Sequence, residues 1–175
     1  MAIVLDRDGV INDHRRFVNG PEDFYLYPYA ARAIRMLNES GLPVYVATNQ
    51  GGVGLGYTTL ESLSEIHEKM NILLEMQGAK IDDIAYCPHR PDEGCSCRKP
   101  KPGMLIDLQK KHNFDFGCSF MVGDRETDIE AGKQIGMKTI LIGTDKANTK
   151  ADYRAKDLLE AAEYILQAEN SCATE

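Results

Sequence analysis

IVLDRDGV, residues 3–10, is an apolar run that ends in two acidic residues and a glycine. Side chains two residues apart in an extended strand point to the same side, so Asp6 and Asp8 would lie about 6–7 Å apart at Cα. Two carboxylates this close repel each other unless a positive charge lies between them. The stretch therefore predicts a buried strand whose carboxyl end holds a cation.

Short β-rich runs alternate with helical patterns along the rest of the chain. The pattern predicts strands at 2–6, 43–48, 81–86, 119–123 and 138–143, and helices at 29–40, 60–77, 103–111, 126–135 and 156–168. Thr58 and Glu61 form a candidate capping box for the second helix. The alternation is typical of an α/β fold, with a Rossmann-like parallel sheet, helices on both faces and ligands at the carboxyl ends of the strands.

The composition limits the classes of partner. A chain of 175 residues fits one domain, 1–175, and no linker or repeat interrupts it. The net charge of −7 argues against a broad basic surface for nucleic acid. The apolar start is too short for a signal peptide, and no later run approaches a membrane-spanning length. We therefore expect a cytoplasmic monomer with a small-molecule substrate and no nucleic-acid or membrane partner.

Polar residues follow three of the predicted strands: DRDG at 6–9, TNQGG at 48–52 and GDRETD at 123–128. Taken singly, they are ordinary loop residues or helix caps. Together they place three acidic groups, a hydroxyl and glycine-rich backbone at one sheet edge. Carboxylates are hard oxygen ligands that suit Mg²⁺, and a hydroxyl with free N–H groups suits a phosphate. We interpret this edge as a site for a phosphate and Mg²⁺.

A second motif lies in a loop rich in proline and glycine, 87–97. Three sulfurs and one imidazole within eleven residues form a complete tetrahedral set for a structural Zn²⁺: Cys87, His89, Cys95 and Cys97. The alternative is a group of free thiols beside a surface histidine. The two remaining cysteines are expected to be a buried thiol, Cys118, and a tail residue, Cys172.

Basic residues follow the zinc motif directly, at Arg98, Lys99 and Lys101. Such runs are usually solvated surface. A metal-clamped loop after the third strand would deliver them to the sheet edge that carries Asp6, which favours phosphate binding. We predict that Lys99 stabilises the phosphoryl group and that Arg98 recognises the substrate, with Lys101 a weaker candidate.

DxDG at the first strand, Thr48 at the second, a lysine before the fourth and GDxxxD after it resemble the haloacid dehalogenase superfamily of phosphotransferases. The resemblance spans 6–128. It implies that Asp6 takes the phosphoryl group as an aspartyl-phosphate and that Asp8 acts as general acid and base. It further implies that Mg²⁺ binds Asp6, the Asp8 backbone carbonyl and Asp124, with Asp128 in support.

DRDGVIN, TNQGG, CPH with CxCRKPxPGM, and MVGDRETD narrow the resemblance to small phosphatases that remove the C7 phosphate of a heptose 1,7-bisphosphate. Histidinol-phosphate phosphatase domains are similar and remain the alternative. The resemblance implies these catalytic and substrate-binding residues: His14, Arg15, Arg16, Phe17, Thr48, Asn49, Gln50, Gly51, Arg98, Lys99 and Arg125. Arg15, Arg16 and Leu55 depart from the residues common in that family.

Two other classes make different predictions. A phospho-receiver signalling domain also uses acids, a threonine and a lysine on a parallel sheet, but places its phosphoacceptor on the third strand, which here ends in Cys87. A zinc-stabilised binding module would carry a basic, aromatic-rich surface. The 7% aromatic content and the net charge of −7 argue against that module.

Overall fold

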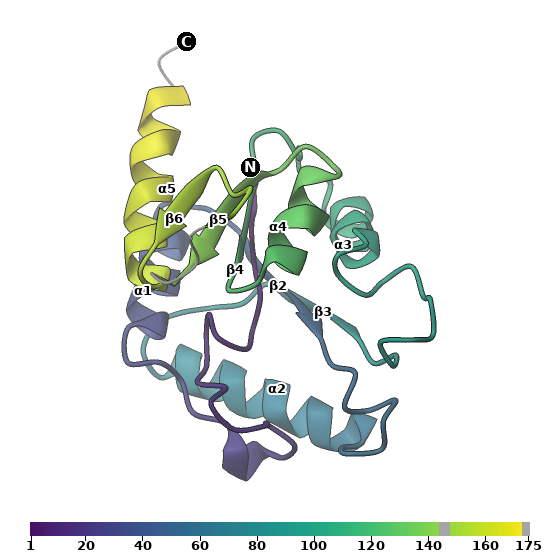
Figure 1. Cartoon of the computed structure of the whole chain (residues 1–175). Helices are drawn as coiled ribbons and strands as arrows, with labels where there is room; N and C mark the ends of the chain where they lie inside the picture. Colours follow the sequence, from purple (N-terminus) through teal and green to yellow (C-terminus); the bar gives the residue numbers. More distant parts are fainter. Residues whose placement is uncertain (144–147, 173–175) are drawn as a thin grey trace.

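A computed structural model describes residues 1–143 and 148–172, with side chains described up to residue 168. Its elements follow one another in the order β1 (Ile3–Leu5), η1 (Pro21–Asp23), α1 (Ala30–Glu39), β2 (Val44–Asn49), α2 (Leu60–Glu75), β3 (Asp83–Cys87), α3 (Gly103–His112), β4 (Phe120–Gly123), α4 (Glu126–Lys133), β5 (Lys138–Ile142), β6 (Tyr153–Ala155) and α5 (Leu158–Cys172) (Figure 1).

The strands form one six-stranded parallel sheet in the order β3-β2-β1-β4-β5-β6. β1 lies between β2 and β4, with Leu5 level with Val46 on one side and Val122 on the other. The chain therefore emerges from β1 at the middle of the carboxyl edge, where the strand order reverses. The predicted fold class, a Rossmann-like parallel sheet, is confirmed.

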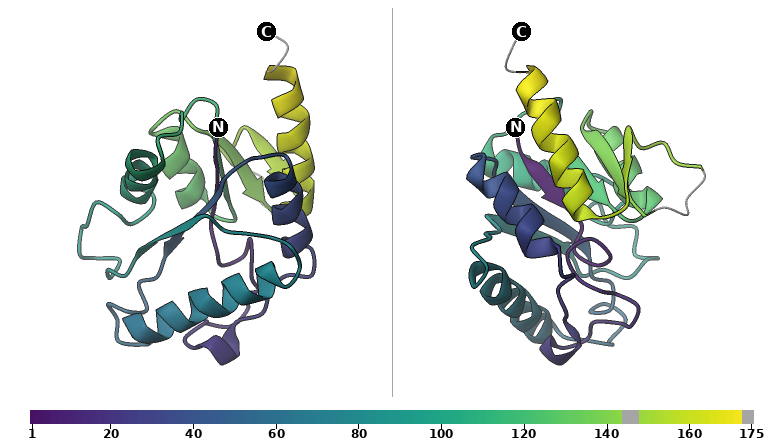
Figure 2. Two further views of the ribbon diagram at one scale, coloured as in Figure 1. Left: turned by 180° about the vertical axis from the view of Figure 1, so that it is seen from behind. Right: turned by 90° about the vertical axis from the view of Figure 1, so that its left-hand side faces the viewer.

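Alternation along β1 builds a core on each face of the sheet. Ile3 and Leu5 belong to a cluster with buried residues of α1, α2 and α5, whereas Ala2 and Val4 belong to a cluster with residues of α3 and α4. Figure 2 shows α1 beside α5 on one side of the strands and α3 with α4 on the other. Helices thus cover both faces, which leaves the strand ends as the open edge.

Local details differ from the sequence predictions. The cap of α2 is Thr59, whose hydroxyl accepts from the Ser62 backbone N–H, while the Thr58 hydroxyl donates to the Asn19 carbonyl. The predicted capping box at Thr58 is therefore wrong by one residue. β6 was not predicted at all, and the other element ends shift by a few residues.

Two loops dominate the carboxyl edge of the sheet: residues 6–29, which include η1, and residues 88–102. The first is held against α2 by the bond from Thr58 to Asn19 and by Lys69 Nζ, which donates to the Pro21 carbonyl at 2.6 Å. In the described part of the chain, no helix has the length and apolar character needed to cross a membrane.

Candidate active site

The buried centre of the site is a lysine between two carboxylates. Lys99 Nζ lies 3.0 Å from an Asp6 oxygen and 2.6 Å from an Asp128 oxygen, and it donates to the Ala47 carbonyl at 2.6 Å. The exposed fractions of Asp6, Lys99 and Asp128 are 7%, 3% and 1%. The ion pairs therefore lie inside the protein, where charges are screened little by water.

Burial raises the pKa of Asp6 to about 6; the Lys99 charge opposes this shift, and Asp128 and Asp8 add to it. The positive charge of Lys99 is shared between two carboxylates, so the three groups carry a net charge of −1 when all are ionised. A cation at this edge would complete the charge balance and hold Asp6 in its nucleophilic, ionised form.

Asp8 lies in a different environment, with 27% of its side chain exposed. Burial raises its pKa, but the Arg7 charge and hydrogen bonds from Asn12, Arg7 and Gln50 outweigh burial, so the pKa falls below its usual value. The roles implied by the resemblance need the opposite order, with Asp6 ionised as the nucleophile and Asp8 able to hold a proton as the general acid. The low pKa of Asp8 arises from its pairing with Arg7 and from the hydrogen bonds that it accepts.

A third carboxylate approaches the centre because residue 9 has no side chain. Gly9 has φ = +83°, and a Cβ there would lie 2.5 Å from an Asp124 oxygen and 2.8 Å from the His14 ring. His14 Nε2 lies 3.6 Å from Asp124 Oδ2. Carboxylate oxygens of Asp6, Asp124 and Asp128 lie within 4.8 Å of one another. This set of hard oxygen donors fits Mg²⁺.

The loop after β2 supports the centre from a second side. Gln50 Nε2 donates to the Thr48 hydroxyl at 2.8 Å, and Thr48 is buried. The Asn49 side chain bonds the Lys99 main chain twice, as donor to its carbonyl and acceptor from its N–H, both at 3.0 Å. Asn49, predicted to bind substrate, thus holds Lys99 in place.

Arg98 reaches the same loop from the other direction. A Cβ at Gly51 would lie 3.0 Å from Arg98 Nη1 and 3.0 Å from the His89 carbonyl oxygen, so the glycine allows this close approach. Nη1 is buried and has no hydrogen-bond partner among the described residues. A buried guanidinium nitrogen with an unused donor is suited to an anionic ligand.

The predicted zinc residues come together in the loop after β3. The Sγ atoms of Cys87, Cys95 and Cys97 are separated by 2.9–3.5 Å, and His89 Nδ1 lies 3.1 Å from Cys97 Sγ. Ligands of a tetrahedral zinc with bonds of 2.3 Å to sulfur would be separated by about 3.8 Å. The cysteines are free thiols, and the cluster is compatible with a zinc-binding loop.

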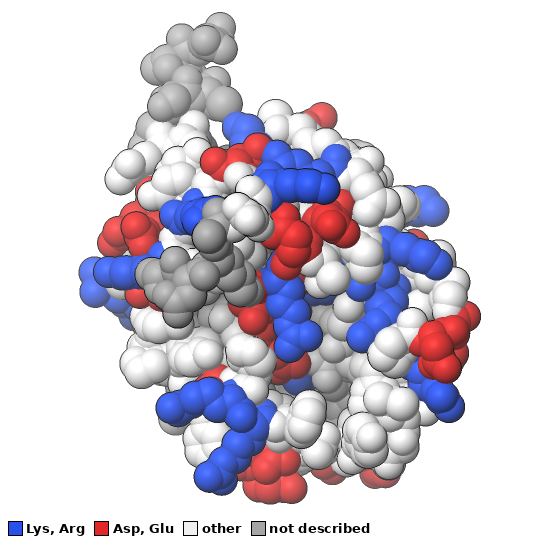
Figure 3. Space-filling model, viewed as in Figure 1, with Lys and Arg blue, Asp and Glu red and all other residues white. Residues whose placement is uncertain are grey.

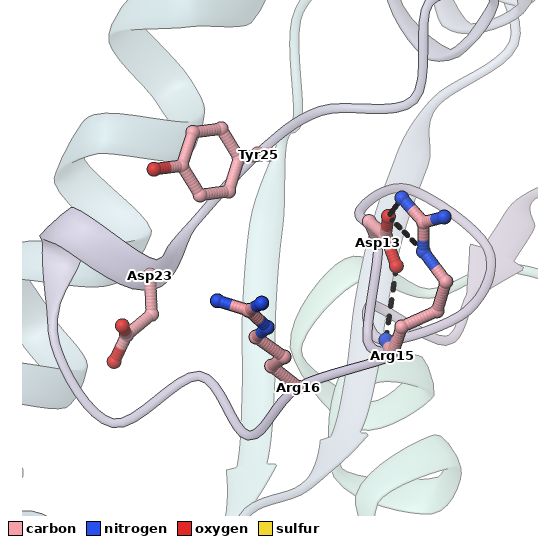
Figure 4. Close-up of a pocket in the computed structure, with 5 residues that line it drawn as sticks. All are labelled: Asp13, Arg15, Arg16, Asp23 and Tyr25. Carbon is pink, nitrogen blue, oxygen red and sulfur yellow. Dashed lines mark hydrogen bonds and ion pairs between the residues drawn. The ribbon is translucent and has the colours of Figure 1, made fainter.

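The first loop forms a separate pocket of about 560 Å³, lined by Asp13, Arg15, Arg16, Asp23 and Tyr25. Arg15 is engaged with Asp13 at 2.5–2.7 Å, whereas the Arg16 guanidinium points into the space between Asp23 and Tyr25 (Figure 4).

Two residues predicted to bind substrate, Phe17 and Arg125, lie at the surface. Phe17 is 87% exposed, and Arg125 is also exposed, although its backbone N–H donates to Asp128 at 3.0 Å. On the face viewed in Figure 3, Lys and Arg lie among Asp and Glu rather than in one basic field.

Two residues that the sequence predictions do not include, Arg7 and Asn12, both donate to Asp8. A signal was available for Arg7: an arginine between two carboxylates on a buried strand end needs an anionic partner, and Asp8 is adjacent. Asn12 lies four residues after Asp8, and only the fold of the loop brings its amide back to that carboxylate.

The fold and the site define a hydrolase of the haloacid dehalogenase type, and comparisons with known proteins agree. Residues 96–167 match the HAD-hydrolase-like family model. The chain is 41% identical over 145 residues to the D-glycero-beta-D-manno-heptose-1,7-bisphosphate 7-phosphatase of Pseudomonas putida, covering 82% of this chain and 83% of the relative. It is 36% identical to the same enzyme of Neisseria meningitidis, covering 94% of each chain.

A crystal structure of D,D-heptose 1,7-bisphosphate phosphatase from B. bronchiseptica, complexed with magnesium and phosphate, superposes with a TM-score of 0.89 at 35% identity. The match covers 96% of this chain and 99% of that chain. The present chain belongs to the D-glycero-beta-D-manno-heptose-1,7-bisphosphate 7-phosphatase family and is an enzyme that hydrolyses phosphate esters.

Proposed function

We propose that this enzyme removes the C7 phosphate from D-glycero-beta-D-manno-heptose 1,7-bisphosphate and leaves the anomeric phosphate on the product. The observation that carries the proposal is the buried Asp6–Lys99–Asp128 cluster at the end of the central strand. Relatives named for this reaction, which match over most of the chain, support the choice of substrate.

The reaction proceeds in two displacements at phosphorus. An Asp6 oxygen attacks the phosphorus and the bond to the sugar oxygen breaks. Asp8 first takes up a proton, against the preference of Arg7 and the two amides for its ionised form, and then gives that proton to the sugar oxygen. Water then attacks the phosphorus of the aspartyl-phosphate, Asp8 takes a proton from the water, and the bond to Asp6 breaks. Phosphate leaves and the Asp6 carboxylate is restored. Lys99 and Thr48 stabilise charge on the phosphoryl oxygens.

Asp6, the Asp8 backbone carbonyl and Asp124 are the residues that we propose to hold Mg²⁺, with Asp128 as the partner of Lys99. The neighbouring structure with magnesium and phosphate supports this metal. The bound ion supplies positive charge that allows a carboxylate to approach an anionic phosphate. We therefore expect that EDTA stops turnover, that Mg²⁺ restores it, and that the melting temperature changes little.

Basic residues of the two loops, 6–29 and 88–102, bind the anomeric phosphate, which lies far from the reacting C7 phosphate. Arg98 Nη1 is buried beside Gly51 without a partner among the described residues, and Arg16 points into the first-loop pocket. A charge-assisted contact at this remote end orients the reacting phosphate as well as adding affinity.

Arg98→Ala should therefore cost on the order of 2–3 kcal/mol in transition-state binding for the bisphosphate and much less for a simple monoester. Steady-state kinetics on both substrates measure the difference. Arg90→Ala is the control, because Arg90 is exposed on the same loop and pairs with Asp92. An equal loss on both substrates would contradict the assigned contact.

Phosphorus NMR of the product tests the substrate assignment. We expect the primary phosphate signal to disappear with formation of inorganic phosphate while the anomeric phosphate remains. Faster turnover of histidinol phosphate than of the heptose bisphosphate, or a surviving primary phosphate, would overturn the substrate assignment and leave the phosphatase chemistry standing.

We also propose that Cys87, His89, Cys95 and Cys97 hold one structural Zn²⁺ per chain. The loop is rich in proline and glycine, and Lys101 Nζ bridges two of its residues by donating to the Gly94 and Cys95 carbonyls. A metal there would fix the segment that delivers Arg98 and Lys99 to the centre.

Cys97→Ser should lower the zinc content and raise KM, because the basic residues that follow lose their anchor. Atomic absorption on protein purified without chelator gives the metal content. The prediction that Cys118 is a buried thiol is wrong, because Cys118 is exposed. Cys118→Ser is therefore a suitable control, since this thiol also lies outside the cluster. Unaltered protein that contains no zinc would reject the site.

We further infer that the enzyme acts as a monomer in the cytoplasm, on a sugar phosphate of heptose biosynthesis. The described cysteines Cys87, Cys95, Cys97 and Cys118 form no disulfide, which suits a reducing compartment. One domain spanning 1–175 is consistent with the single sheet, and size-exclusion chromatography with light scattering would measure the oligomeric state.

A further inference from the structure

Arg7 is a fully buried arginine next to the reacting carboxylates. The exposed fraction of its side chain is 0%. By volume, Arg7 has the largest fully buried side chain in the described part of the chain. A buried guanidinium is costly unless it is paired, and an apolar side chain of similar volume would usually stabilise the fold at least as well. Its presence therefore calls for an explanation beyond packing.

The Arg7 guanidinium forms an ion pair and several hydrogen bonds with Asp8. Its Nη2 lies 2.9 Å from Oδ1 and 3.1 Å from Oδ2 of Asp8, and its Nε lies 3.2 Å from Oδ1. No other ion pair of Arg7 is found among residues 1–143 and 148–168, and its Nη1 is buried without a partner in that part of the chain. Arg7 therefore has one anionic partner, which it contacts through two of its nitrogens.

Two neutral amides complete the contacts of the Asp8 carboxylate. Asn12 Nδ2 donates to Oδ1 at 2.9 Å, and Gln50 Nε2 donates to Oδ2 at 3.0 Å. Arg7 and Asn12 flank Asp8 in the loop after β1, and Gln50 reaches it from the loop after β2, so together they fix both the position and the plane of the carboxylate. Rotation about the Cβ–Cγ bond of Asp8 would break several of these contacts at once.

No second cation competes for this carboxylate from the covering helix. His67 of α2 is 8% exposed, and burial together with the Arg7 charge lowers the pKa of His67 to about 4. The imidazole is therefore neutral near pH 7, and its Nε2 has no hydrogen-bond partner among the described residues. The orientation of Asp8 thus depends on Arg7 and the two amides.

We propose that Arg7 is a positioning residue, with Asn12 as its second support, that holds the Asp8 carboxylate in the orientation needed for both proton transfers. This inference rests on the proposed role of Asp8. A misplaced Asp8 would slow departure of an alkoxide, which needs a proton, but not departure of a nitrophenolate, which leaves without one. It would also slow attack of water on the aspartyl-phosphate for every substrate.

The test compares Arg7→Lys with unaltered enzyme on an alkyl phosphate and on nitrophenyl phosphate. Because kcat/KM covers only the steps up to formation of the aspartyl-phosphate, we expect a loss of about 30-fold for the alkyl ester and less than threefold for the nitrophenyl ester. With nitrophenyl phosphate, kcat and KM should fall together, and a burst of one equivalent of nitrophenolate should precede steady turnover.

Asn12→Ala should give the same pattern more weakly, and it keeps the test decisive if Arg7→Lys does not fold. Leu108→Ala, a buried change in α3 within the apolar cluster on the other face of the sheet, controls for lost stability and should show no dependence on the leaving group. Mg²⁺ affinity by calorimetry should stay within threefold of the unaltered enzyme.

Equal losses on the two esters in both variants, or no loss on either, would overturn the positioning role. Failure of the unaltered enzyme to release phosphate from the heptose bisphosphate, or to form a covalent phosphoenzyme, would instead contradict the proposed function, so the two failures are distinguishable.

Discussion

Asp6→Asn is expected to lower phosphate release by at least about 10⁴-fold while the protein stays folded. An amide of the same shape still accepts the Arg7 backbone N–H, which lies 2.8 Å from Asp6 Oδ1, but it is not a nucleophile. The change also leaves Lys99 and Asp128 as a neutral pair, so no uncompensated charge is created. Phosphate assays with circular dichroism and a melting curve measure both effects.

Asp107→Asn is the matched control, because Asp107 is exposed on α3 and lies outside the site. It should leave activity unchanged. Turnover of Asp6→Asn within tenfold of the unaltered enzyme would exclude a covalent intermediate on Asp6.

The second large effect is expected at Lys99. Lys99→Met would leave Asp6 and Asp128 buried without their shared cation, which should lower the free energy of unfolding by about 3–5 kcal/mol and reduce activity by on the order of 10³-fold. Urea unfolding at pH 7 measures the first quantity, and phosphate release measures the second.

A double variant separates the two roles of this lysine. Adding Asp128→Asn to Lys99→Met removes one of the unpaired charges and should recover much of the stability but none of the activity. Lys101→Met is the single-variant control, since Lys101 is exposed and bonds carbonyls of the zinc-motif loop rather than the buried acids. Equal stability of Lys99→Met and Lys101→Met would contradict the role assigned to the buried cluster.

The sequence was sufficient to predict the sheet and the edge at which the site lies, because these depend on regular patterns. The apolar run at Ile3–Leu5, the alternation of strands with helices, and the polar residues after three of the strands locate Asp6, Thr48 and Asp124 at one end. The spacing of cysteines and histidine between Cys87 and Cys97 was also sufficient to predict that the four candidate zinc ligands lie close together.

The hydrogen-bond and ion-pair partners of the individual site residues could not be predicted in the same way. The sequence placed Lys99 near Asp6, but the 2.6 Å contact with Asp128 depends on how α4 begins over β4. Asn49 bonds Lys99 across 50 residues of sequence, which no local pattern reports. β6 has only three residues with an exposed arginine at its centre, so its apolar signal is too weak to identify.

The loop of residues 6–29 is anchored to α2 through Thr58 and Lys69, whereas the loop of residues 88–102 is anchored through Asn49 and the cysteine cluster. The attachments at Thr58 and Lys69 lie outside the buried Asp6–Lys99–Asp128 cluster, whereas Asn49 bonds the main chain of Lys99, a member of that cluster. The first loop is therefore the more modular of the two: we expect that segment 15–25, which follows His14 and its contact with Asp124, can change in length or charge while the bond-breaking groups keep their places. Substrate preference can therefore diverge within this scaffold without loss of the underlying hydrolysis, and loop grafting is a practical route to new phosphatases.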